Sequence, residues 1–150
     1  MAGLQEVTEL GNKRGIKQEF RKDYGFGPID LVWYFEIHAD LGPITCGFIE
    51  LREQEGGSKD LEDGQYSLRK IEEAIMTGIR SGMDRLFLFC GNEDVAKSVT
   101  GQIQWLSSRG SLIRYDSYCQ VLFPGKDGQI KTTSVEKKTL SKQENGLNEG

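Results

Sequence analysis

The sequence of 150 residues is poor in the residue types that mark several common classes of protein. Its three cysteines, Cys46, Cys90 and Cys119, lie far apart and lack CxxC spacing, so we expect neither a disulfide framework nor a cysteine metal centre. There is a single histidine, His38, no apolar run that could span a bilayer, and no signal-peptide segment. These absences favour a cytoplasmic protein that does not enter a membrane and keeps its thiols reduced and buried.

The sequence also lacks a net positive charge. Its 19 Lys and Arg residues and 23 Asp and Glu residues give a formal charge of −4 and a pI near 5.1. That balance argues against the broad basic field of a non-specific nucleic-acid binder, although it is compatible with a local basic patch. Acidic residues around a metal ion also lower the net charge without opposing DNA, because the ion restores positive potential locally.

Length and composition fit a single domain with its own core. Hydrophobic residues make up 37% of the chain and charged residues 28%, and there are only three prolines. From Pro124 onward the sequence is polar and lysine-bearing, with few apolar residues to anchor it. We therefore expect an α/β domain over residues 1–123 and a polar tail over residues 124–150 that is mobile or ordered by a partner.

Hydrophobic periodicity predicts helices and strands in an α/β order. The expected elements are a helix over residues 4–22, strands over 29–38 and 44–52, a helix over 65–81, a strand over 85–91, a helix capped by Asn92, and a strand over 111–123. The run 85–91 is continuously apolar, which is typical of a central strand covered on both faces. The order predicts an α+β fold, in which helices flank a mixed central sheet that contains a β-hairpin.

The predicted hairpin has charged residues at its open end. If its turn centres near Leu41, antiparallel pairing sets Asp30 opposite Arg52 and Val32 opposite Glu50. Alternation then puts the two carboxylates and the arginine on one face of the sheet. Carboxylates this close need positive charge between them, which either Arg52, as a surface ion pair, or a divalent cation can supply. A shift of one residue in register would send Asp30 to the opposite face.

These residues resemble the PD-(D/E)xK motif of the restriction-endonuclease-like nucleases. The segment GPID corresponds to the PD element and IELR to the (D/E)xK element, with Arg52 at the lysine position. Because arginine cannot accept a proton, Lys70 or Lys59 is a candidate to take the role of the missing lysine. Glu19, in the expected first helix, is similar to the helical glutamate that many compact members use as an extra metal ligand. The family usually has a further strand before the aspartate, which the sequence does not predict.

The resemblance implies a restriction-endonuclease-like fold and a divalent-metal-dependent DNA endonuclease. Asp30, Glu50 and Glu19 would hold Mg²⁺ or Mn²⁺, and Arg52 and Lys70 would complete the catalytic set. The basic residues expected to contact DNA phosphates are Lys13, Arg14, Lys17, Arg21 and Lys22. Cutting both strands requires two such sites, so a homodimer is expected. The alternative interpretation is a catalytically inactive α/β module that acts as a protein-interaction or regulatory scaffold.

Overall fold

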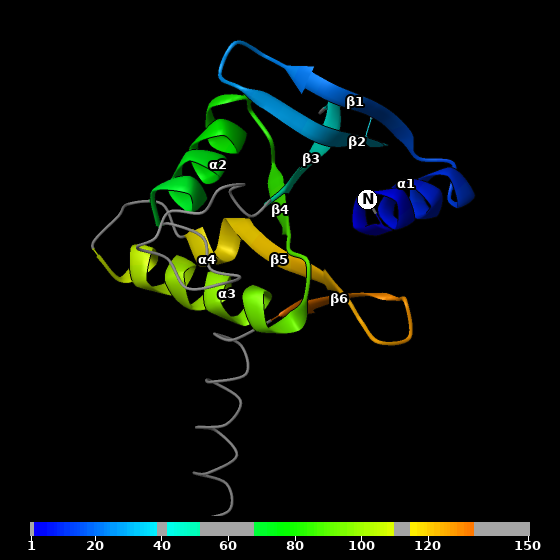
Figure 1. Ribbon diagram of the computed structural model, residues 1–150. Helices are drawn as coiled ribbons and strands as arrows, with labels where there is room; N and C mark the ends of the chain where they lie inside the picture. The colour runs from blue at the N-terminus through cyan, green and yellow to red at the C-terminus, as the bar shows by residue number, and fades with distance from the viewer. Residues whose placement is uncertain (1, 39–41, 52–67, 110–114, 134–150) are drawn as a thin grey trace, which may run out of the picture.

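A computed structural model describes residues 2–38, 42–51, 68–109 and 115–133. Over these ranges the chain forms an α+β fold around one six-stranded mixed sheet, in the strand order β1-β2-β3-β4-β5-β6 (Figure 1), which confirms the expected fold class. The elements are α1 (Ala2–Lys13), β1 (Lys17–Asp23), β2 (Pro28–His38), β3 (Gly42–Glu50), α2 (Leu68–Arg80), β4 (Arg85–Phe89), α3 (Glu93–Ser108), the short α4 (Tyr115–Tyr118), β5 (Cys119–Pro124) and β6 (Ile130–Thr133).

The sheet combines antiparallel and parallel pairing. Strands β1, β2 and β3 form an antiparallel meander, β3, β4 and β5 run parallel, and β6 returns antiparallel to β5. Backbone hydrogen bonds from Leu51 to Phe89 (2.9 Å) and from Cys90 to Leu122 (2.8 Å) continue the ladder to the ends of the parallel strands. The carboxyl ends of β3, β4 and β5 therefore meet along one edge of the sheet, here called the carboxyl edge. The opposite edge, where these strands begin, is the amino edge.

Both faces of the sheet are covered. Helix α1 packs Val7 against Leu31 and Phe48, while α2 and α3 pack on the other face around Ile75 and Leu88 (Figure 1). The expected stripes on the two later helices are confirmed, because these residues are buried: Ile71, Ile75, Val95, Val99, Ile103 and Leu106. Asn92 caps α3 as predicted, its side chain accepting a hydrogen bond from the amide of Val95 at 2.9 Å.

The first helix is shorter than predicted. It ends at Lys13 because Gly15 adopts φ +68°, a left-handed conformation that ends many helices. The amide of Gly15 donates to the carbonyl of Asn12 (3.1 Å) and that of Ile16 to the carbonyl of Gly11 (2.9 Å), which closes a Schellman motif. Residues 17–22, expected to be helical, instead belong to the edge strand β1. This is a strand before the aspartate, the element that the sequence alone did not predict.

The C-terminal part of the domain also differs from expectation. Residues 115–118 are helical, so the last predicted strand begins only at Cys119. The sheet then continues past residue 123, because β6 pairs with β5 through Leu122 with Thr132 and Phe123 with Lys131. The expected polar tail is therefore wrong for residues 124–133, and its remainder lies outside the described residues.

The register of the hairpin is not the predicted one. Val32 pairs with Gly47 rather than Glu50, a difference of three residues, and an odd difference exchanges the two faces. The cause is a β-bulge: His38 pairs with Gly42 but Phe35 pairs with Ile44, so β2 carries one extra residue between them. Without that residue the alignment set at the turn would bring Asp30 directly opposite Glu50.

The structure bears on the three cysteines and on the apolar character of the helices. Cys46, Cys90 and Cys119 are free and buried, as predicted. Burial raises the pKa of the Cys90 thiol to about 12, so this thiol stays protonated at neutral pH. Of the helices in the described ranges, none combines the length and the apolar character that crossing a membrane requires.

Candidate functional site

The aspartate and glutamate of the motif meet at the carboxyl edge. The Oδ2 atom of Asp30 accepts a hydrogen bond from the backbone amide of Glu50 at 2.8 Å, in a partly buried position. The paired register of β2 with β3 ends at Leu31 and Phe48, while β2 still pairs with β1 through Ile29 and Lys22. At the point where β2 and β3 separate, the Asp30 carboxylate thus accepts the hydrogen bond that a backbone carbonyl would accept within the paired part of the strands.

The two acidic residues meet through one side chain and one backbone amide. Glu50 aligns with Phe89 of β4 and comes two residues after Phe48 on β3. Its side chain therefore lies on the same face as these two rings, which is the face covered by α1. Alternation is interrupted beside Asp30, because Ile29 packs with Val32 and Met83 although Leu31 packs on the α1 face. The predicted common face therefore stays a prediction, and the contact that the structure shows runs from the Asp30 side chain to the Glu50 backbone. Both side chains are partly exposed at the edge.

Of the other expected catalytic and metal-binding residues, Lys70 lies on α2, Glu19 lies on β1, and Arg52 cannot be placed. Arg52, and with it Lys59, lies outside the described residues. Lys70 is exposed in the first turn of α2. Glu19 lies on β1 opposite Val32 and not on a helix, and its Oε2 atom is 3.3 Å from Nζ of Lys22. The expectation of Glu19 as a helical ligand is therefore wrong.

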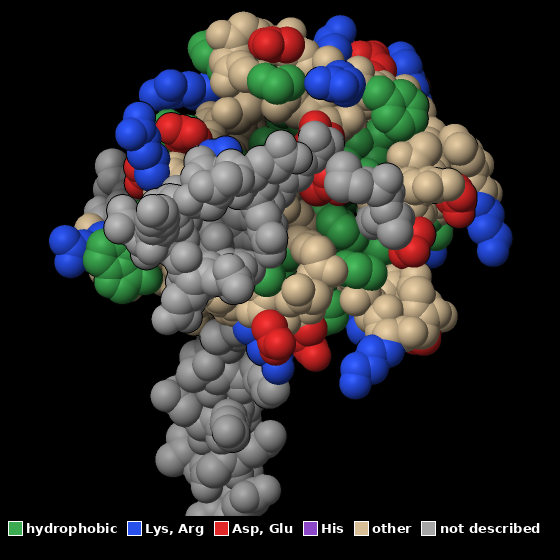
Figure 2. All heavy atoms as spheres, viewed as in Figure 1, with side chains coloured by type: hydrophobic (Ala, Val, Ile, Leu, Met, Phe, Trp, Pro, Cys, Tyr) green, Lys and Arg blue, Asp and Glu red, His purple; other side chains and the backbone are tan. Residues whose placement is uncertain are grey.

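The expected DNA-binding residues divide into two groups. Lys22 pairs across β1 and β2 with Ile29, so it and Arg21 lie at the end of the sheet that holds Asp30. Lys17 pairs with Tyr34, which comes four residues after Asp30 on β2, or about 13 Å at the usual rise per residue. Lys13 and Arg14 precede Lys17 in the chain. On the face shown in Figure 2, Lys and Arg side chains are scattered among Asp and Glu and form no continuous basic field.

A residue that the sequence reasoning missed is Glu6 of α1. Its Oε2 atom is buried and has no hydrogen-bond partner within the part of the chain that the structure describes. The flank of α1 that carries Thr8 and Asn12 contacts Gln18 of β1, so Glu6, about 200° around the helix from Thr8, faces away from β1. Gly15 is the signal in the sequence that could have pointed to Glu6. A first helix that ends before Gly15 contains Glu6 and Glu9 and leaves Glu19 outside.

The donors at this edge suit a cation that keeps most of its water. No group of three His, Cys, Asp or Glu side chains with metal-binding geometry occurs among the described residues. Mg²⁺ is commonly held by one or two carboxylates and several waters. The second oxygen of Asp30, Oδ1, makes no hydrogen bond in the described ranges. The residues present therefore fit a hydrated divalent ion and not an all-protein cage.

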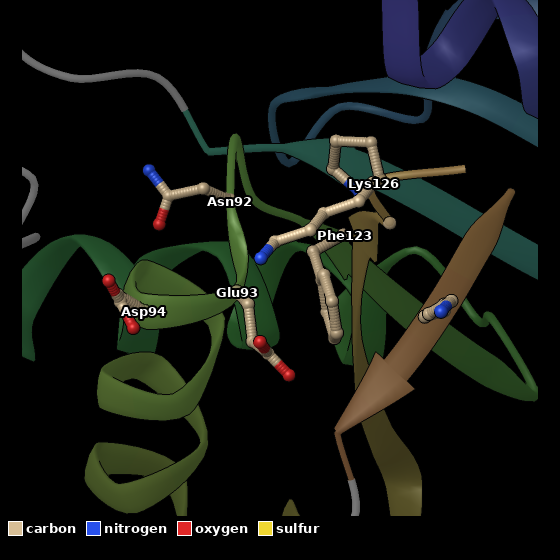
Figure 3. A pocket seen from close by; sticks show the side chains of 8 residues that line it. Asn92, Glu93, Asp94, Phe123 and Lys126 are labelled. Atoms are coloured by element: carbon tan, nitrogen blue, oxygen red, sulfur yellow. The ribbon is translucent and has the colours of Figure 1, made fainter. Parts of the chain in front are cut away.

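A pocket adjoins the contact along the carboxyl edge. It has a volume of about 520 Å³ and is lined by residues 92–94 at the start of α3, residues 123–126 at the end of β5, and Lys131 of β6. We call it the edge pocket. Figure 3 shows the ring of Phe123 forming one wall and Lys126 reaching across the mouth toward the start of α3. Glu50, Phe89 and Leu122 align across β3, β4 and β5, so the backbone of Leu122, which precedes the lining residue Phe123, is about 10 Å from that of Glu50, two strand spacings away.

Of the expected site residues, four lie at one end of the sheet: Asp30, Glu50, Arg21 and Lys22. No family model matches this chain, and neither a curated protein nor a solved structure does. Its function has to be inferred from these residues and their geometry.

Proposed function

We propose that this protein is a divalent-metal-dependent DNA endonuclease whose site lies where β2 and β3 separate. The observation that carries the proposal is the 2.8 Å hydrogen bond from the Glu50 amide to Asp30, which holds the aspartate of GPID against the glutamate of IELR. The resemblance also calls for a strand before the aspartate, and β1 occupies that place in the chain. A helix with a glutamate precedes that strand, as in compact members of the family.

Each residue has a role that follows from its position. Asp30 is oriented by the Glu50 amide, which leaves its Oδ1 atom available as a ligand. Glu50, whose amide makes this contact, is the second ligand. When bound, Mg²⁺ or Mn²⁺ polarises the scissile phosphate and lowers the pKa of the attacking water. Arg52 or Lys70 would offset the negative charge that develops on the phosphate, while Arg21 and Lys22 contact the backbone.

The second candidate function is a catalytically inactive scaffold, and one observation favours it. The contact between Asp30 and Glu50 is a complete structural interaction by itself. Asp84 makes an equivalent bond at the other end of β3, where its Oδ2 atom accepts from the amide of Thr45, also at 2.8 Å. In this interpretation Asp30 terminates the ladder, no ion is needed, and the surface serves a protein partner.

Nicking of supercoiled plasmid in Mg²⁺ or Mn²⁺ separates the two functions. The substitutions Asp30→Asn and Glu50→Gln remove one negative charge each and keep the shape of the side chain. Asp84→Asn is the matched control, because it changes an equivalent cap at the amino edge. Metal-dependent nicking that both site variants abolish and the control retains supports the nuclease, whereas equal nicking by all four proteins indicates a contaminant. Nicks that never progress to linear plasmid would argue against a homodimer acting on both strands.

A further inference from the structure

One wall of the edge pocket is formed by the turn between β5 and β6. The turn between β5 and β6 is built to present Lys126: the Gly128 amide donates to the Gly125 carbonyl at 3.0 Å, and the Gly125 amide to the Gln129 carbonyl at 2.7 Å. Gly128 has φ +80°, a conformation that glycine adopts without strain. The rigid turn therefore holds Lys126 over the pocket, as Figure 3 shows.

Lys131 is held beside it by close packing. A Cβ atom at Gly125 would lie 2.6 Å from Cε of Lys131, so the absence of a side chain at Gly125 makes room for the lysine stem. The Lys131 ammonium is 3.9 Å from Asp127, and both side chains are about half exposed, which makes this a weak ion pair. Lys126 has no ion-pair partner in the described ranges. The two ammonium groups are thus available to an anion at the mouth of the pocket.

The opposite wall of the edge pocket is acidic. Glu93 and Asp94 line it from the first turn of α3, and Glu93 is 3.9 Å from Lys97 on its outer side. Carboxylates repel phosphate but accept hydrogen bonds from amino groups, including the N4 amino group of cytosine. A ligand that suits both walls has an anionic end and an amino-bearing end separated by an apolar part that can lie along Phe123.

We propose that the edge pocket binds one nucleotide of the DNA strand next to the Asp30–Glu50 site, with its phosphate at Lys126 and Lys131 and its base toward Glu93 and Asp94. This inference rests on the proposed function, because the strand in the pocket is the one that is cut. The volume of about 520 Å³ lies in the range of small-molecule sites. A base inside it is unpaired, so the preferred substrate contains a single-stranded or extruded nucleotide, and bases with amino groups bind better than thymine.

Binding of labelled eight-residue oligodeoxycytidine and oligothymidine, measured by fluorescence anisotropy without metal in the Asp30→Asn background, tests the pocket. We expect oligodeoxycytidine to bind about fivefold tighter or more. The pair Lys126→Gln and Lys131→Gln should weaken both oligomers about tenfold and reduce the salt slope by about 1.4. The pair Glu93→Gln and Asp94→Asn should remove the base preference without weakening oligothymidine. Arg80→Gln, at the amino edge, is the control and should change affinity less than twofold.

Three results would overturn the inference: lysine variants that bind like the parent, equal affinity for the two oligomers, and competition by free deoxycytidine monophosphate at concentrations similar to the oligomer. The last would indicate a free-nucleotide site. Thermal melting checks that each variant is folded. Oligomer binding with the expected preference but no nicking would contradict the nuclease and leave the pocket standing. Metal-dependent nicking together with unaltered oligomer binding in the lysine variants would support the nuclease and contradict the nucleotide site in the pocket.

Discussion

The two ends of β3 make the same hydrogen bond in different surroundings. At the amino edge, Oδ2 of Asp84 accepts from the Thr45 amide at 2.8 Å and from the Thr45 hydroxyl at 3.2 Å, and the Asp84 amide returns a bond to the Thr45 carbonyl at 2.9 Å. At the carboxyl edge, the one bond that Oδ2 of Asp30 accepts from the described residues comes from the Glu50 amide, at 2.8 Å. Asp84 is exposed and joins the start of β4 to β3, whereas Asp30 is partly buried beside a second acidic residue.

This comparison separates a structural use of a carboxylate from a candidate functional one. Both residues satisfy a strand amide that would otherwise lack a partner. Asp30 differs in being partly buried, in having Glu50 as an acidic neighbour, and in lying on the edge that carries the pocket with Lys126 and Lys131. The hydrogen bond by itself therefore assigns no function, and the surroundings of the bond are what a substitution has to test.

The largest expected difference between the two edges is in nicking activity. Replacing residues that merely support a metal ligand typically costs 10-fold to 100-fold, so Asp30→Asn should reduce metal-dependent plasmid nicking by at least about 100-fold. Asp84→Asn should change it by less than about twofold, because it lies at the opposite edge. Initial nicking rates at saturating Mg²⁺ measure both. Equal losses in the two variants would show that the site variant acts through folding alone.

Stability should distinguish the edges less strongly. Asp30→Ala leaves the partly buried Glu50 amide without an acceptor and should lower the free energy of unfolding by about 1–3 kcal/mol. Asp84→Ala uncovers an amide that water can reach, so a loss below about 1 kcal/mol is expected. Urea unfolding followed by tryptophan fluorescence gives both values. A larger loss for Asp84→Ala would reverse the ranking of the two caps.

A smaller effect is expected from metal alone. An ion that binds only the folded protein stabilises it by about 1.4 kcal/mol at ten times its Kd. Mn²⁺ should therefore raise the melting temperature of the parent and of Asp84→Asn, and leave that of Asp30→Asn unchanged. Ca²⁺-free buffer with EDTA provides the baseline. The same rise in all three proteins would place the ion elsewhere.

The smallest effect concerns the thiols that report on each edge. Burial raises the pKa of Cys46, with a further contribution from the charge of Asp84, whereas burial alone raises that of Cys90 from 9.0 to about 12. Because the folded-state pKa is the higher one, the stability from the neutral thiol is complete below about pH 9 and is lost as the pH rises toward 12.

Asp84→Asn should therefore speed alkylation of native Cys46 by no more than about threefold and leave Cys90 unaffected. Peptide mass spectrometry after iodoacetamide treatment at pH 8.5 measures the two rates separately. Faster reaction at Cys90 as well would indicate loosening of the whole fold and not a local change in charge.

Most of the secondary structure was predictable because it depends on local pattern. The helical stripe around Ile71 and Ile75, the apolar strand before Cys90 and the Asn92 cap are all present as expected. Two of the features that were predicted wrongly, the length of the first helix and the register of the hairpin, also have local causes. The Schellman motif at Gly15 ends α1 early, and a bulge between Phe35 and His38 shifts the hairpin register. A bulge has no sequence signature of its own here, since it adds one residue to an otherwise regular alternation.

The sequence by itself determined the α+β class, the later helices and the presence of acidic residues where the hairpin opens, since periodicity and capping act over a few neighbouring residues. Tertiary structure alone decided how those residues meet. The bulge changed the register of β2 against β3, and the separation of β2 from β3 let the Asp30 carboxylate reach the Glu50 amide. Parallel pairing of β3, β4 and β5 then brought the edge pocket beside them, because strand order joins segments that are far apart in the chain.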